Sequence, residues 1–114
     1  MRTDKDRLLD IQEAIDRIEG QKNITRSEFD KNQLLQIWCL HYLQIIGEAA
    51  NRISEGMRAK HNEIPWGKLI GMRHILVHGY FEIDLDIVWN TIHVDLPGLK
   101  EQVNKIIKDI KVIE

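Results

Sequence analysis

Apolar residues recur at intervals of three and four near the start of the chain. Leu8, Ile11, Ile15 and Ile18 share this spacing, which places their side chains on one face of an α-helix. Gly20 follows, and glycine is a residue at which helices commonly end. The pattern predicts an amphipathic helix that ends near Gly20 and packs one stripe against a neighbour.

A second and longer helix is predicted to begin near Ser27, which can cap it together with Asp30. Apolar residues keep helical spacing from there for about thirty residues. The apolar band is wider than one neighbouring helix would cover, so we expect this helix to pack within its own bundle and also against a second subunit, forming a homodimer. The band consists of Leu35, Trp38, Tyr42, Ile45, Ile46, Ala49, Ala50, Ile53 and Met57.

The second half of the chain predicts three more helices. One has Pro65 in its first turn and stops at Gly79. Asp84 can cap a short helix, and a last helix is expected to begin at or near Asp95 with Pro97 in its first turn. No segment shows the period-two alternation of a strand. The whole pattern predicts an all-α bundle of four to five helices with short connections.

The composition is that of an ordinary globular protein, with 43% hydrophobic and 30% charged residues among 114. This length suits a single domain, which we assign to residues 1–114. No apolar run is long enough to span a membrane, and the charged first residues do not resemble a secretory signal, so we expect a cytoplasmic protein. The lone Cys39 excludes an internal disulfide, and its apolar neighbours predict a buried thiol.

The charge balance changes along the chain. A net charge of −2 argues against general attraction to nucleic acid. Residues 51–80 nevertheless contain five Lys and Arg against two Glu, whereas residues 82–95 contain four acidic residues and no Lys or Arg. This distribution predicts a local basic zone around residues 73–80.

Arg73 falls in the middle of the apolar face of the helix predicted from Pro65 to Gly79. A buried guanidinium requires a partner, so Arg73 either pairs with a carboxylate inside the bundle or points into a polar cleft between subunits. Glu48, at the edge of the long helix's apolar band, is a candidate partner. An internal ion pair without a catalytic role fits the pattern equally well.

His78 lies at the predicted last turn, within reach of Arg73, and Tyr80 follows Gly79. Imidazole exchanges protons near neutral pH and guanidinium binds phosphate oxygens, so the pair suits metal-independent cleavage of RNA, whose 2′-hydroxyl is the nucleophile. Spacing alone also allows plainer roles, with His78 as a helix C-cap and Tyr80 as a packing residue.

His74 and His78 are four residues apart, the spacing at which two histidines of one helix can bind zinc. A third ligand would have to be a carboxylate or one of His41, His61 and His93. The chain has no HExxH motif, and we expect neither a metal nor another cofactor.

Arg73, His78 and Tyr80 form the pattern R-x4-H-x-Y, which resembles the signature of the HepT family within the HEPN superfamily. Other segments are similar to that family in the same order along the chain. They are Ile46-Gly47-Glu48-Ala49, Ile64-Pro65-Trp66, Gly71-Met72-Arg73, Ile75-Leu76-Val77-His78-Gly79-Tyr80 and Asp84-Leu85-Asp86-Ile87-Val88-Trp89.

The resemblance implies a helical homodimer with a composite cleft, and a metal-independent ribonuclease toxin in which Arg73 and His78 carry the catalysis. It also implies a partner, a nucleotidyltransferase antitoxin of the MntA kind that neutralises the toxin by transferring AMP to Tyr80. The added anion would block the cleft and neutralise its charge. His74 departs from the superfamily pattern, in which Asn or Asp often follows the motif arginine, but it remains polar and capable of hydrogen bonding. Glu48 and His74 are expected as supporting residues of the cleft.

Two other functions fit the same residues. The chain could be a non-catalytic subunit that binds a nucleotide or docks the nucleotidyltransferase, or a zinc protein that uses His74 and His78. Calorimetry with ATP or AMP and elemental analysis separate these from a ribonuclease.

Overall fold

The computed structural model describes residues 2–72, 74, 77–78 and 82–113, within overall dimensions of 46 × 27 × 25 Å. The helices are α1 (Asp4–Glu19), α2 (Arg26–Asp30), α3 (Gln33–Arg52), α4 (Glu55–Lys60), α5 (Trp66–Ile70), α7 (Leu85–Asn90) and α8 (Leu96–Ile113). A π-helical turn, Thr91–Asp95, joins α7 to α8, and the short strands β1 (Val77–His78) and β2 (Glu82–Ile83) pair antiparallel.

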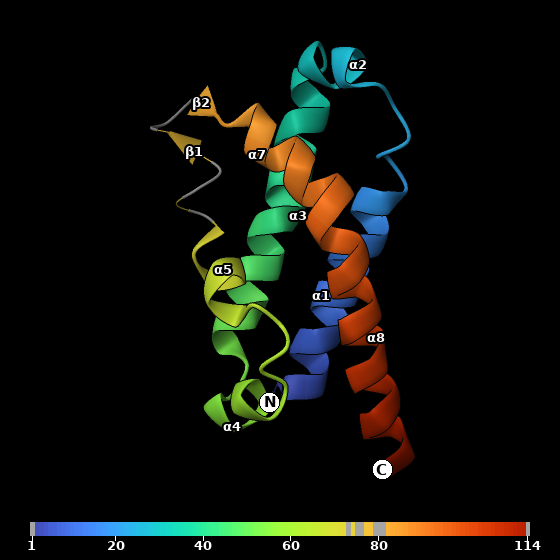
Figure 1. Ribbon diagram of the computed structural model, residues 1–114, viewed down its shortest axis with the longest axis vertical. Coiled ribbons are helices and arrows are strands. Elements are labelled where there is room, and N and C mark those ends of the chain that lie inside the picture. The colour runs from blue at the N-terminus through green and yellow to red at the C-terminus, as the bar shows by residue number, and fades with distance from the viewer. Residues whose placement is uncertain (1, 73, 75–76, 79–81, 114) are drawn as a thin grey trace.

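The long helices α1, α3 and α8 form the body of the molecule, and α1 packs against both of the others (Figure 1). Both ends of the chain lie at the same end of this body (Figure 1). The apolar stripe predicted on the first helix is buried here, as expected. Fully buried side chains at the centre include Leu8, Ile11, Ile15, Ile18, Leu43, Ile46 and Ile106. The all-α prediction is confirmed for the described chain apart from the β1–β2 ribbon.

The predicted thirty-residue helix is wrong in its bounds, because the chain forms α2, α3 and α4 instead. Thr25, not Ser27, caps α2 through a capping box with Glu28. Asn32 then caps α3 by accepting a hydrogen bond from a backbone N–H, and Ser54 caps α4 in the same way. Polar caps break the helix while the apolar spacing continues, since residues on both sides of each break still pack into the core.

The helix predicted from Pro65 to Gly79 is wrong in its bounds. The α5 helix spans Trp66–Ile70 with Gly71 as its C-cap, and Met72 and His74 are also helical. The backbone of Val77–His78 instead pairs with Glu82–Ile83 as a ribbon. The run Ile75-Leu76-Val77 misled the prediction, because a short apolar run fits a strand as well as a buried helix. The expectation that the chain has no strand fails at the same place.

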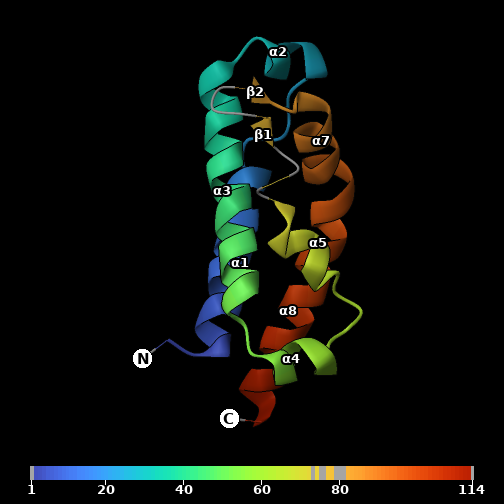
Figure 2. The ribbon, with the colours of Figure 1, turned by 90° about the vertical axis from the view of Figure 1, so that its left-hand side faces the viewer.

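Asp84 caps α7 as predicted, accepting a hydrogen bond from the Ile87 N–H at 3.1 Å. The last helix is not separate, because Asn90, Thr91 and Leu96 all keep right-handed helical backbone angles. The chain therefore runs from α7 through the π turn into α8 as one rod (Figures 1 and 2). Asp95 lies within this rod and does not begin a helix. Within the described residues, no helix is long and apolar enough to cross a membrane.

Candidate functional site

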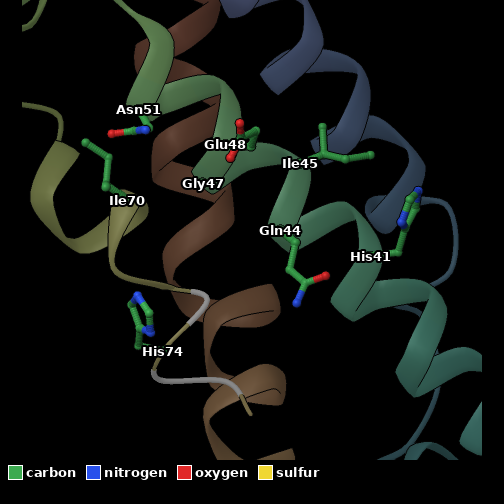
Figure 3. A pocket seen from close by; sticks show the side chains of 8 residues that line it. All are labelled: His41, Gln44, Ile45, Gly47, Glu48, Asn51, Ile70 and His74. Carbon is green, nitrogen blue, oxygen red and sulfur yellow. The ribbon is translucent and has the colours of Figure 1, made fainter. Parts of the chain in front are cut away.

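A cleft of about 500 Å³ opens beside α3, at the level of α5. Side chains of α3 line one side, and Ile70 and His74 lie across from them (Figure 3). This volume is within the range of small-molecule sites in proteins. The lining residues are His41, Gln44, Ile45, Gly47, Glu48, Asn51, Ile70 and His74.

The polar side of the cleft is one face of α3. His41, Gln44, Glu48 and Asn51 follow each other at intervals of three and four, so their side chains project from the same side of the helix. Glu48 and His74, both predicted as supporting residues, do lie at one cleft. Gln44 and Asn51 were not predicted, although polar residues at helical spacing beside an apolar band are a signal for them.

Gly47 sets the distance between α3 and α5. A Cβ atom at this position would lie 2.7 Å from the backbone carbonyl oxygen of Leu69, closer than real contacts allow. The absence of a side chain at Gly47 thus lets α5 lie directly against α3. Because Ile70 follows Leu69 and lines the cleft, this contact also positions one wall of the site.

The carboxylate of Glu48 accepts a hydrogen bond from Nε of Arg52 at 2.9 Å, one helical turn away. Both side chains are about half exposed, at 50% and 55%, so this ion pair contributes little to stability. Its effect is to hold Glu48 at the rim of the cleft. Arg73, for which Glu48 was the candidate partner, lies outside the described residues, so that pairing stays a prediction.

Of the motif segment, residues 73–80, the structure describes His74 and the backbone of Val77–His78. His74 is exposed, and its backbone N–H donates to the Gly71 carbonyl oxygen at 3.0 Å. The backbone of His78 belongs to β1, opposite Glu82, so its interpretation as a helix C-cap is wrong. Arg73 and Tyr80 lie outside the described residues, and their roles stay predictions.

The three histidines considered as extra zinc ligands have different surroundings. His41 lines the cleft with His74. His61 pairs with Glu63 at 3.6 Å, and the ring nitrogens of His93 lie 3.0 and 3.2 Å from the carbonyl oxygens of Trp89 and Lys22. No group of three or more His, Cys, Asp or Glu side chains within the described residues could hold a metal ion.

The basic zone predicted around residues 73–80 falls largely outside the described residues, so it stays a prediction. Of the described lining residues, Glu48 is acidic and none is Lys or Arg. Two basic residues of the predicted zone are paired, Arg52 with Glu48 and Lys68 with Asp95 at 3.1 Å. The described part of the cleft is thus polar without being basic.

Cys39 is buried, as its neighbours predict, and is 3% exposed. Burial raises the pKa of its thiol from 9.0 to about 11. The thiol is therefore protonated near neutral pH and is a weak nucleophile. Cys39 is not among the described residues that line the cleft.

The described fold and the histidine-lined cleft are consistent with a small all-α protein of HEPN type. Comparison with known families gives a match of residues 11–106 to the family described as "Ribonuclease HepT-like". The chain belongs to this HepT-like family.

Relatives of similar length support the assignment. "Probable ribonuclease HepT" of Thermococcus cleftensis is 38% identical over 94% of this chain and 98% of its own length. Two proteins of Methanocaldococcus jannaschii, each named a "Putative RNase", are 39% identical; one alignment covers 82% of this chain and 85% of the relative, the other 91% and 87%. No solved structure shows significant similarity to the chain.

Proposed function

We propose that the chain is a metal-independent endoribonuclease that acts as the toxin of a toxin–antitoxin pair. The observation that carries the proposal is a polar cleft, lined by His74 of the R-x4-H-x-Y segment, in a chain of the HepT-like ribonuclease family. Arg73 and His78 are the proposed catalytic residues, with Glu48 and His74 in supporting roles.

The proposed reaction is a transesterification. The 2′-oxygen of a ribose attacks the adjacent phosphorus, the bond from phosphorus to the 5′-oxygen breaks, and the products are a 2′,3′-cyclic phosphate and a 5′-hydroxyl. A proton leaves the 2′-hydroxyl and another reaches the departing 5′-oxygen. The imidazole of His78 suits such proton transfer, and the guanidinium of Arg73 suits the charge that builds on the phosphate oxygens.

Regulation is proposed to act on Tyr80, two residues after His78. A nucleotidyltransferase antitoxin would transfer AMP from ATP to the Tyr80 hydroxyl, releasing pyrophosphate. The phosphate of the attached AMP would compete with RNA for the same cationic groups. A homodimer, with cleft residues from both copies, completes this proposal.

The test is cleavage of RNA in EDTA by the purified protein. His78→Ala and Arg73→Ala are each expected to abolish cleavage without loss of helical content. His61→Ala is the matched control, because His61 is a histidine outside the cleft. Unchanged cleavage by both motif variants would contradict the assignment of Arg73 and His78 as catalytic residues.

A second candidate is a non-catalytic subunit that binds a nucleotide or docks the nucleotidyltransferase. The observation that favours it is the absence of Lys and Arg from the described cleft lining. Tight binding of AMP or ATP by calorimetry, without any RNA turnover, would select this candidate over the ribonuclease.

A further inference from the structure

The described cleft is poorly suited to a phosphate group. Its charged residue among the described lining is Glu48, an anion like phosphate, and the cation that pairs with it, Arg52, does not belong to that lining. An uncharged ligand group that carries hydrogen-bond donors suits this described lining better than a phosphate does.

Hydrogen-bonding groups on α3 are available for such a ligand. The side-chain amides of Gln44 and Asn51 make no hydrogen bond to any described residue, although Gln44 is half-buried. One carboxylate oxygen of Glu48 accepts from Arg52, and no contact with another described residue is seen for the second oxygen. These three side chains lie on one side of α3 and point toward the cleft (Figure 3).

The cleft also has apolar walls. Ile45 lies beside the polar side chains on α3, and Ile70 and the ring of His74 lie on the other side (Figure 3). A flat aromatic ligand with a polar edge matches this combination, since its faces can pack on apolar or aromatic side chains while its edge forms hydrogen bonds. Unpaired bases of RNA are recognised in this way.

We propose that the cleft binds an unpaired guanine of the RNA, with the Glu48 carboxylate accepting hydrogen bonds from N1–H and the N2 amino group. Guanine alone among the four bases presents two adjacent donors on its pairing edge, and a carboxylate only accepts. Gln44 and Asn51 lie on opposite sides of Glu48 along α3, so the amide of one of them can donate to the O6 acceptor of the same base. Arg52 acts as a positioning residue, because it fixes the Glu48 carboxylate. This inference rests on the proposed function for its RNA ligand.

The test measures binding, so that it does not depend on cleavage. His78→Ala protein is titrated, by fluorescence anisotropy, into an oligouridine and into the same oligomer with its central uridine replaced by guanosine, adenosine or cytidine. The guanosine oligomer is expected to bind about tenfold or more tightly than the other three, as hydrogen bonds to a charged group are worth this much. Adding Glu48→Gln is expected to remove the preference.

Glu13→Gln is the matched control. Glu13 pairs with Arg17 at 3.1 Å on α1, so this substitution removes the same kind of one-turn ion pair as Glu48→Gln but lies outside the cleft. The control is expected to keep the guanine preference.

Equal affinity for the four oligomers, a preference for another base, or a guanine preference that survives Glu48→Gln would overturn the inference. The proposed function is tested separately by the unaltered protein. A protein that prefers guanine but never cleaves RNA would contradict the ribonuclease proposal without contradicting guanine binding in the cleft.

Discussion

The close packing of α3 on α5 makes Gly47→Ala an informative substitution outside the motif. The new methyl group would lie 2.7 Å from the Leu69 carbonyl oxygen, whereas ordinary contact begins at 3.4 Å. The two helices would have to separate by several tenths of an ångström. Overpacking of this kind costs about 1–3 kcal/mol, and the helix preference of alanine over glycine offsets about 1 kcal/mol of it.

Gly98→Ala is the control, because nothing lies within 4 Å of a Cβ atom at Gly98 in α8. That variant gains helix preference without a clash, so its free energy of unfolding should exceed that of Gly47→Ala by about 1–3 kcal/mol. Urea unfolding followed by tryptophan fluorescence measures the difference. Gly47→Ala is also expected to reduce RNA cleavage, since Ile70 on α5 moves with the cleft wall. Equal stability of the two variants would refute the close approach of the helices.

Three further predictions concern stability. Thr25→Ala should lower the free energy of unfolding by about 1 kcal/mol, because Thr25 caps α2, whereas Ser27→Ala should change it little; equal effects in a denaturant titration would contradict the capping box. Ile46→Ala should cost about 2–5 kcal/mol in the same assay, since Ile46 is fully buried, and a smaller loss would mean a looser core. Cys39 has a pKa raised from 9.0 to about 11, so its thiol ionises first in the unfolded chain, and stability should fall as the pH rises from 9 toward 11. A Cys39→Ala variant that shows the same fall would exclude the thiol as its cause.

Two local predictions, the first helix and the cap at Asp84, agree with the structure. The first helix has its stripe from Leu8 to Ile18 and its end at Gly20, and Asp84 caps α7. The helix breaks at Asn32 and Ser54 were missed, because apolar spacing indicates which side chains face the core. It does not indicate whether the backbone between those side chains stays helical.

The candidate site was predicted in part. Glu48 and His74 were placed at it, and both line the cleft. The helical projection failed at His78, because the β1–β2 pairing depends on a contact with Glu82 further along the chain that no local pattern reports. Gln44 and Asn51 were missed for a different reason. Polar residues at this helical spacing are usually solvated, and here Ile70 of α5 lies across from them and completes a cleft.

The central claim is that the motif segment cleaves RNA without a metal ion. The most direct measurement is incubation of RNA with the protein in EDTA, followed by mass analysis of the product ends. We predict fragments that end in a 2′,3′-cyclic phosphate, produced by the unaltered protein and not by His78→Ala. Intact RNA with the folded, unmodified protein, or the same fragments from the His78→Ala variant, would contradict the claim.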